Sequence, residues 1–326
     1  MKQWKKLPNL GLYCYYPNPI AVEKIAQNTD RQDIYKAMLV ALGLAIAVAW
    51  YFYWAKFDGQ ITGFFRIGSV LPLSPLLNPA ETLIYQGELG YAGQQFLTIA
   101  QDPGLQNQDS IAALDHPSYR YRRILYPLLG YLLGLGNPVL IPWALVVINI
   151  LAIAVCTGLT AVYFQSQKQK TIGALAVLAI PGIWMVLFLS TADLLASVFS
   201  LGAVVCQQIF PPHQSKKWWL VPILLALALL TRETSLIIWL AIALTLVQNR
   251  QWRSMVALLL SLIPLTLWFG YIRWRQLPGG SGTGNFGWPL VGIGEKFQSL
   301  IQAGPTGNNI YEAYLWLLLL LTLALL

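Results

Sequence analysis

Long runs of apolar residues dominate this chain and limit what it can fold into. A transmembrane helix needs about 20 mainly apolar residues to cross the hydrocarbon layer of a membrane. Runs of that kind occupy residues 37–55, 139–164, 171–189, 193–210 and 254–272. Of the 326 residues, 56% are hydrophobic and only 10% are charged, which is more apolar surface than one soluble core can bury. These observations predict an all-α fold, a polytopic bundle of transmembrane helices.

Three shorter apolar runs complete a predicted bundle of about eight membrane segments. Residues 218–230 and 235–247 flank the polar turn 231–234, and each arm is about 20 Å long at 1.5 Å per residue. The two arms form either one long helix with charges at mid-membrane, or a hairpin whose turn lies just below the membrane surface. The last run, 314–326, is short for a span, so we expect the natural chain to continue beyond it.

Basic residues are unevenly distributed among the segments that connect the helices, and this distribution predicts orientation. With a cytoplasmic N-terminus and a hairpin at 218–247, residues 1–36, 165–170, 211–217 and 248–253 all face inside. These four segments hold twelve basic and three acidic residues. The other nine basic and ten acidic residues then face outside, so the charge asymmetry favours the hairpin over one long helix.

The same assignment gives one integral membrane domain over residues 1–326. A cytoplasmic tail covers 1–36, a large outer loop with interfacial helices covers 56–138, and a second outer loop covers 273–310. The apolar stretch from Arg122 to Gly136 is too short to span, so we expect a helix along the outer interface. Its tyrosines and those just before it are expected at the depth of the lipid headgroups, namely Tyr119, Tyr121, Tyr126 and Tyr131.

Signals for several other functions are weak. GTGNFG, residues 282–287, matches the glycine pattern of a dinucleotide site, but it follows a membrane helix instead of a strand. With two histidines, the chain cannot build a multi-histidine metal site. The net charge of +8 and the basic and aromatic cluster 119–123 would suggest nucleic acid in a soluble protein. Next to a membrane they favour lipid phosphate, so no nucleic-acid partner is expected.

Charged side chains near the membrane are candidate functional groups, because charge is costly at membrane depth. Arg232 and Glu233 lie at the tip of the predicted hairpin, where the alternative is a mutually satisfied ion pair. Asp193 follows Ser190 at the spacing of a helix capping box, so we expect it to cap a helix. Arg273 ends a helix on the outer side and either reaches lipid headgroups or helps to hold an anionic lipid.

The arrangement resembles the GT-C superfamily, the polytopic membrane glycosyltransferases that take sugars from polyprenyl-phosphate carriers on the outer side. The resemblance rests on an uncleaved first helix with a long outer loop, on RRILYPLLGYLLGLGNP, and on the paired short helices LLALALLTRETSLIIWLAIALTL. More narrowly, three stretches are similar to an uncharacterised bacterial branch in which the second usually reads GYDGQ. They are FDGQITGFFRIG, GYAGQQFLTIAQDP and LDHPSYRYRRILYPLLGYLLGLG.

This resemblance implies an inverting sugar transfer at a site that faces the periplasm from a bacterial inner membrane. An outer carboxylate would take the proton of the acceptor hydroxyl, and basic side chains would stabilise the leaving phosphate. A polyprenyl-phosphate-linked sugar and membrane lipids are the expected partners. No cofactor is indicated, and a divalent metal stays open.

Ala92 stands where the branch pattern has its acid. Asp58, just after the first helix, is the best remaining candidate for the base, with an ordinary turn residue as the alternative. Glu88 is nearer to Ala92 in sequence but lies across Gly90, and Asp102 is too far along the expected helix to replace it. Since general-base catalysis contributes roughly 10² to 10⁴ in rate, the chain is expected to be weakly active, inactive or a disabled variant without an acid.

Basic and aromatic side chains of the outer segments are the expected substrate-binding groups. Arg232 matches the basic hairpin position of the superfamily and is the first choice for contact with phosphate. The others are Gln94, Arg120, Tyr121, Arg122, Arg123, Glu233 and Arg273. Two alternatives are a transporter and a non-enzymatic protein that binds the lipid carrier. The charges near membrane depth cluster at outer ends, which favours a cavity open on one side over alternating access.

Overall fold

The computed structural model describes residues 4–6, 13–15, 31–212 and 215–277, together with the isolated positions 298 and 302. Within these residues the chain is mostly helical, which confirms the predicted all-α class. The described strands form two short pairs. β1 (Trp4–Lys6) is antiparallel to β2 (Tyr13–Tyr15), and β3 (Ile67–Gly68) is parallel to β4 (Ile84–Tyr85). GTGNFG, the run 314–326 and nearly all of the second outer loop lie outside the described residues.

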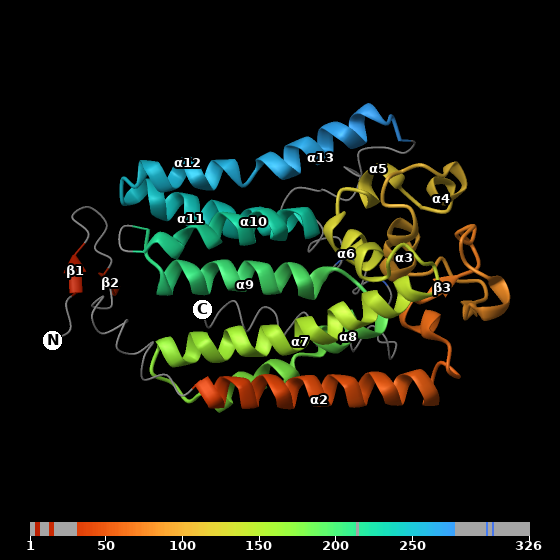
Figure 1. Cartoon of the computed structure of the whole chain (residues 1–326), viewed down its shortest axis with the longest axis horizontal. Coiled ribbons are helices and arrows are strands. Elements are labelled where there is room, and N and C mark those ends of the chain that lie inside the picture. The colour runs from red at the N-terminus through yellow and green to blue at the C-terminus, as the bar shows by residue number, and fades with distance from the viewer. Residues whose placement is uncertain are drawn as a thin grey trace. The chain divides into compact units, whose positions relative to one another are not determined.

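Three helical segments are long and apolar enough to cross a membrane, and they lie in the bundle of helices drawn in Figure 1. The first is in α2 (Arg31–Ala55) and the second is α7 (Leu140–Ser166). The third combines α12 (Trp252–Leu260) with α13 (Ile263–Trp274). The described residues therefore show three spans, or four if a bent pair is counted, where the sequence predicted about eight.

The bent pair explains part of this difference. The 3-10 helix η3 (Thr171–Ala179) and α8 (Pro181–Leu189) meet at an angle of 59°. A residue that precedes proline is pushed out of the helical conformation, and Ile180 before Pro181 is extended, with φ −79° and ψ 113°. The unbroken helix predicted over 171–189 is thus two helices. α9 (Asp193–Ile209) is unbroken but shorter than a full span.

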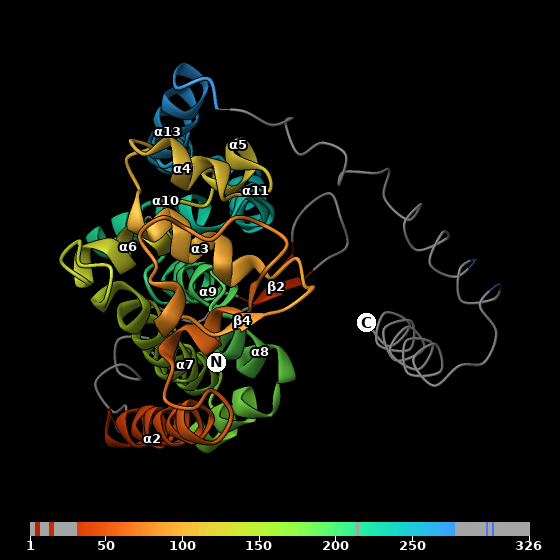
Figure 2. The same ribbon diagram turned by 90° about the vertical axis from the view of Figure 1, so that its right-hand side faces the viewer.

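The polar turn at 231–234 reverses the chain, as the charge distribution predicted. After the 3-10 helix η4 (Lys216–Trp219), α10 (Leu220–Thr231) ends where Arg232 becomes extended, with φ −157° and ψ 129°. A further 3-10 helix, η5 (Glu233–Ser235), leads into α11 (Leu236–Gln248). Leu229 and Trp239 from the two arms share one buried cluster, and Figure 2 shows α10 and α11 as separate neighbouring helices.

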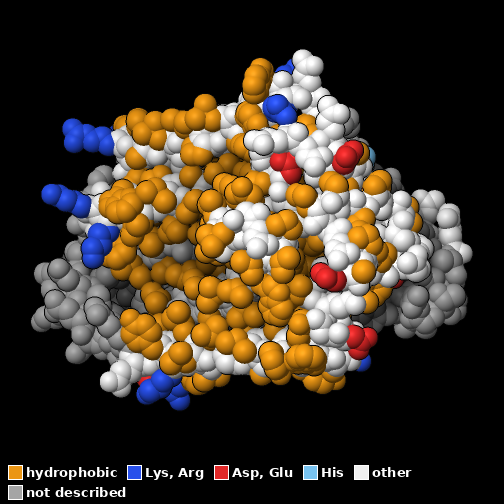
Figure 3. All heavy atoms as spheres, turned by 45° about the vertical axis from the view of Figure 1, so that its right-hand side comes forward, with side chains coloured by type: hydrophobic (Ala, Val, Ile, Leu, Met, Phe, Trp, Pro, Cys, Tyr) orange, Lys and Arg blue, Asp and Glu red, His pale blue; other side chains and the backbone are white. Residues whose placement is uncertain are grey.

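The connecting segments gather at the two ends of the bundle (Figure 1). One end holds the turns from α7 to η3, from α9 to η4 and from α11 to α12. The opposite end holds the segment between α2 and α7 and the turn between α10 and α11. In Figure 3, Lys and Arg side chains project from the first end, and most of the Asp and Glu side chains in view lie toward the second, where some Lys and Arg side chains are also visible. The acidic side chains of the described residues thus gather mostly at the second end, while the side of the membrane that each end faces stays a prediction.

A polar cap forms the second end. Its helices are short: η1 (Ile61–Phe65), η2 (Pro79–Glu81), α3 (Ala92–Gln101), α4 (Gln108–Ala112), α5 (Pro117–Arg120) and α6 (Leu125–Leu133). Phe65 and Phe96 of the cap belong to the same buried cluster as Ala45 of α2 and Leu145 of α7, so cap and bundle share one core.

Two tyrosines expected at headgroup depth are instead buried inside the cap. Tyr121 and Tyr126 are both 0% exposed. The hydroxyl of Tyr126 donates to the carbonyl oxygen of Leu145 at 3.1 Å and accepts from Nδ2 of Asn149 at 3.0 Å. α6 therefore packs into the molecule against α3 and α7, and its exposed residues are leucines at its far end, such as Leu132 and Leu133.

Candidate functional site

A cavity of about 300 Å³ lies in the polar cap, between the start of α3, the α5 segment, the start of α9 and the turn after α10. We call it the arginine cavity. Its charged lining residues are Asp115, Arg120, Arg123, Asp193 and Arg232. Tyr91, Ala92, Gln95 and Thr191 line it between these charges. The fold thus brings together four of the positions singled out from the sequence, namely Ala92, Arg120, Arg123 and Arg232.

The GYAGQQ stretch forms one wall of this cavity because of its two glycines. Gly90 has a φ of +83°, a conformation that side chains rarely adopt. A Cβ on Gly93 would lie 2.1 Å from the carbonyl oxygen of Leu189, so α3 approaches the end of α8 as closely as only glycine permits. Between them, Ala92 is the first residue of α3, and no side chain of the described residues caps this helix end.

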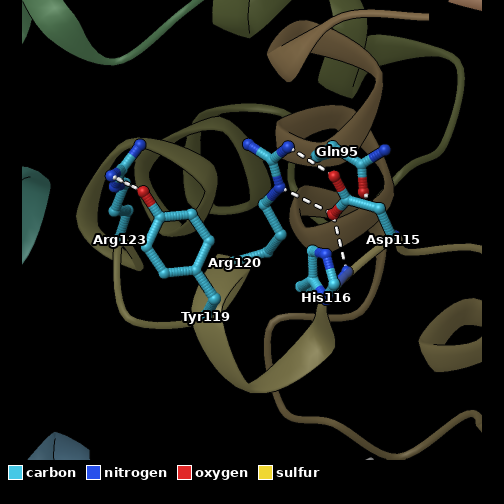
Figure 4. A network of polar contacts seen from close by, with 6 residues as sticks. All are labelled: Gln95, Asp115, His116, Tyr119, Arg120 and Arg123. Carbon is cyan, nitrogen blue, oxygen red and sulfur yellow. Dashed lines mark hydrogen bonds and ion pairs between the residues drawn. The ribbon is translucent and has the colours of Figure 1, made fainter. Parts of the chain in front are cut away.

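Asp115 and Arg120 form a two-pronged ion pair at one side of the cavity, shown in Figure 4. Nε of Arg120 donates to Oδ1 of Asp115 at 2.8 Å, and Nη2 donates to Oδ2 at 2.6 Å. The backbone N–H of His116 also donates to Oδ1, at 2.6 Å. Burial alone would raise the pKa of Asp115, but Arg120 and this N–H outweigh it, so the pKa is lowered and the carboxylate stays ionised.

The other two arginines of the cavity also have carboxylate partners. Nε of Arg123 donates to Oε2 of Glu233 at 3.0 Å, and Nη2 of Arg123 donates to the hydroxyl of Tyr119. Arg232 forms an ion pair with Asp193. Burial and the nearby positive charge of Arg123 lower the pKa of Arg232. Each arginine therefore has a carboxylate partner, and in place of the Arg232–Glu233 pair that the sequence left open as an alternative, the structure has the pairs Arg123–Glu233 and Arg232–Asp193.

The two other candidate acids lie away from the lining of the cavity. Asp58 is exposed and has a φ of 48°, directly before Gly59 with a φ of 72°. It is therefore a turn residue after α2, the alternative foreseen from the sequence. Glu88 pairs with Arg66 through two hydrogen bonds of 2.8 and 2.6 Å, an interaction that raises the pKa of Arg66.

Five predicted substrate-binding residues also lie apart from the cavity lining, and Glu233, the partner of Arg123, is one of them. Gln94 is buried, and its Oε1 accepts from the backbone N–H of Gly68 at 3.0 Å. Tyr121 is buried, and its hydroxyl donates to the carbonyl oxygen of Asp102 at 2.8 Å. Arg122 lies 5.7 Å from the ring centre of Phe269, with no carboxylate partner among the described residues. Arg273 is exposed at the end of α13.

Three residues of the cavity were not foreseen as site residues. Gln95 lies next to Gln94 in the sequence, and its Oε1 accepts from the N–H of Asp115 at 3.3 Å (Figure 4). Asp115 opens the predicted DHPSYRYRR stretch, which was a usable signal. For Asp193 the predicted capping box is wrong, because Ala192 is the N-cap of α9 and no side chain caps it.

A second, larger cavity of about 680 Å³ adjoins the same segments, and we call it the apolar cavity. Ile124, Leu128, Leu230, Leu267 and Trp268 supply its apolar lining. Neighbouring residues of two stretches of chain therefore line the two cavities: Arg123 and Arg232 line the arginine cavity, and Ile124 and Leu230 line the apolar cavity. At the polar end of the apolar cavity lies Gln101, which is 7% exposed and whose Nε2 has no hydrogen-bond partner within the part of the chain that the structure describes.

The carboxylate of Asp102 also lies at this polar end, where it accepts from the N–H groups of Gln106 and Asn107 at 3.0 and 2.8 Å. It therefore shapes the loop after α3 and, as expected, is not beside Ala92. No group of three or more His, Cys, Asp or Glu side chains among the described residues is placed to hold a metal ion.

Comparison of the chain with protein-family models, with curated proteins and with solved structures finds no match in any of the three. The function therefore has to be argued from the two cavities and their side chains.

Proposed function

We propose that this protein is a membrane glycosyltransferase of the GT-C type, which takes a sugar from a polyprenyl-phosphate carrier at the polar cap. In this proposal the bundle lies in a bacterial inner membrane, with its basic end in the cytoplasm and its cap in the periplasm. The observation that carries the proposal is that a cavity lined by three arginines and a larger, mainly apolar cavity are lined by neighbouring residues of the same two stretches of chain, 123–124 and 230–232.

An amphiphilic anion fits this pair of cavities. Arginine side chains bind phosphate oxygens through forked, charge-assisted hydrogen bonds, and three arginines line the smaller cavity. The larger cavity offers leucine, isoleucine and tryptophan side chains to an apolar chain. At about 680 and 300 Å³, the two volumes are in the usual range for sites of small organic ligands.

Ala92 favours one alternative, a non-enzymatic protein that binds the lipid carrier, because position 92 lines the cavity without an acid. A transporter is less compatible with the arrangement. Its substrate path would need polar groups along the bundle, whereas the charged residues of both cavities lie at one end.

The first test is binding of farnesyl phosphate, a short polyprenyl phosphate, to the purified chain in lipid nanodiscs. Arg232→Ala should weaken this binding about tenfold or more, because hydrogen bonds to charged groups contribute about 1.5 to 3 kcal/mol. Binding can be followed by the intrinsic tryptophan fluorescence.

Arg122→Ala is the matched control, since it removes the same charge from a residue that does not line the arginine cavity. We expect less than a twofold change for this variant. Equal binding of farnesyl phosphate by the unaltered chain and by Arg232→Ala would rule out the phosphate role of Arg232. Transfer itself is tested with polyprenyl-phosphate glucose and mannose in proteoliposomes, where binding without sugar release would favour the non-enzymatic alternative.

A further inference from the structure

The arginine cavity is lined by two carboxylates, Asp115 and Asp193, although Ala92 stands at the position expected for the acid. We propose that Asp193 is the catalytic base of this cavity, and that it is held by Arg232 until the phosphate of the carrier takes its place. This inference rests on the proposed function. The inference identifies the residue that accepts the proton, and it states that the carrier phosphate binds before the proton is transferred.

Helix capping does not explain the position of Asp193. The residue begins α9, but Ala192 is the N-cap and no side-chain oxygen accepts from the first N–H groups. The carboxylate instead lines the cavity and pairs with Arg232, which comes from the turn between α10 and α11. Its side chain is 37% exposed, about twice the 19% of Asp115, so it is the more accessible of the two carboxylates in the cavity lining.

The other carboxylates of the cap are unsuitable as a base. Asp115 accepts three hydrogen bonds, from two nitrogens of Arg120 and from the N–H of His116, and its pKa is lowered. Glu233, Glu88 and Asp58 do not line the cavity. For the carboxylate of Asp193 the structure gives one partner, Arg232, among the described residues. A base needs a free lone pair within reach of the hydroxyl, so Asp193 is the lining carboxylate that meets this need.

Phosphate and Asp193 then compete for the same guanidinium. When the carrier phosphate binds Arg232, the Asp193 carboxylate loses its cationic partner and gains an anionic neighbour. Both changes favour the protonated form of the carboxyl group, so they make Asp193 a stronger base at the moment when the donor is in place. Donor binding would in this way prepare the proton acceptor.

The reaction step balances without any further reactant. The acceptor hydroxyl oxygen forms a bond to the anomeric carbon of the sugar, and its proton moves to a carboxylate oxygen of Asp193. The bond between the anomeric carbon and the phosphate oxygen breaks, and its electron pair stays on that oxygen. The additional negative charge on the phosphate lies next to Arg232, which stabilises it.

Competition for Arg232 predicts opposite effects of two substitutions on binding of farnesyl phosphate. Asp193→Asn removes the internal competitor and should tighten binding about tenfold, the order expected when one competing charge is removed from a partly buried site. Arg232→Ala weakens it. A merely structural ion pair gives a different result, because loss of either partner would then leave binding weaker or unchanged.

Turnover measurements distinguish a catalytic base from a residue that only competes with phosphate for Arg232. Release of sugar from polyprenyl-phosphate glucose or mannose by the reconstituted chain should fall at least a hundredfold in Asp193→Asn, in line with the usual contribution of a general base. Asp193→Glu keeps a carboxylate and should retain more turnover than Asp193→Asn. Adding Ala92→Asp to Asp193→Asn should restore part of the activity, since both positions line the same cavity.

The outcomes distinguish the two proposals. No binding of farnesyl phosphate by the unaltered chain overturns the proposed function, and this inference with it. Binding that Asp193→Asn leaves unchanged or weakens overturns the exchange at Arg232 while the proposed function stands. Tighter binding by Asp193→Asn with no loss of sugar release, or no release by the unaltered chain, overturns the role of Asp193 as a base. Unfolding temperatures of all variants verify that each is folded.

Discussion

The three arginines of the arginine cavity differ in how far along the chain their carboxylates lie. Arg120 and Asp115 are five positions apart, a separation at which the sequence itself suggests a contact. Arg123 and Glu233 are 110 positions apart, and nothing in either segment identifies the other. The sequence could therefore indicate which arginines gather at one cavity, but it could not show that each has its own carboxylate.

A related difference concerns Gln94 and Gln95. Consecutive residues on a helix point about 100° apart, so Gln95 lines the cavity while Gln94 points away from the lining, toward the N–H of Gly68. Which one does so depends on how Gly93 packs against Leu189, and this contact is not visible in the sequence. The sequence pointed to Gln94 as a binding residue, whereas its neighbour Gln95 lines the cavity.

Asp115 gives a pH dependence that can be measured. Its folded-state pKa lies below the ordinary value of 3.8, so its stabilising contribution is complete above that value. The contribution is lost as the pH falls from about 3.8 toward the lower folded-state pKa. Thermal unfolding followed between pH 3 and 6 should show a smaller loss of stability on acidification for Asp115→Asn than for the unaltered chain.

The control for this titration is Asp109→Asn, which removes an exposed carboxylate from the first turn of α4. Asp109 makes no ion pair with the described residues, so this variant should follow the unaltered chain. If Asp115→Asn and Asp109→Asn lose stability in parallel as the pH falls, the ion pair of Asp115 with Arg120 does not contribute to folding.

Among the elements, the breaks in the helices are as informative as the helices themselves. Ile180 and Arg232 are both extended. Ile180 interrupts the apolar run 171–189, which reads as one helix in the sequence. Arg232 ends α10 at the point where the sequence allowed either one long helix or a hairpin. Pro181 was a readable signal for the first break, and charge distribution was the signal for the second. The apolar runs indicated where the membrane segments lie. They overestimated how many helices are long enough to span a membrane, because a run of apolar residues does not show where a helix bends or ends.

The contact between α3 and α8 predicts a large effect from a small substitution. In Gly93→Ala, the new Cβ would lie 2.1 Å from the carbonyl oxygen of Leu189 and 3.0 Å from that of Phe65, so one of the two elements must move. Such overpacking costs about 1 to 3 kcal/mol. We expect a lower unfolding temperature together with weaker binding of farnesyl phosphate, because α3 forms a wall of the cavity.

Gly43→Ala is the matched control in α2, where an added Cβ meets nothing within 4 Å. Alanine is favoured over glycine in a helix interior by about 1 kcal/mol, so this variant should be as stable as the unaltered chain or more stable. Equal unfolding temperatures for Gly93→Ala and Gly43→Ala would contradict the close approach of α3 to α8.

For the molecule as a whole, the path of the chain was largely predictable from charge and apolar length. Both properties act over many residues, so errors at single positions average out. The sites needed more, since Tyr121, Gln94 and Asp193 owe their roles to neighbours distant in sequence. The sequence thus pointed to four of the residues that line the arginine cavity, while the pairing of its charges required coordinates.

Orientation in the membrane can be tested with single cysteines at the two ends of the bundle. In a background without Cys14, Cys156 and Cys206, Lys170→Cys lies at the basic end and Gln86→Cys lies in the cap, and both positions are exposed. A membrane-impermeant maleimide added to intact cells whose outer membrane has been permeabilised should label position 86 only. Labelling of both positions from the same side would contradict the proposed topology.

The turn that carries Arg232 and Glu233 has a consequence for how the protein is made. In a membrane, the tip of the α10–α11 hairpin has to carry two charges through the hydrocarbon layer, which is costly. Their partners, Asp193 and Arg123, lie earlier in the chain and are synthesised first. In the proposed topology these partners are already in place when the tip crosses the membrane and would offset that cost, so insertion of the hairpin and completion of the cavity would then be one event in biogenesis.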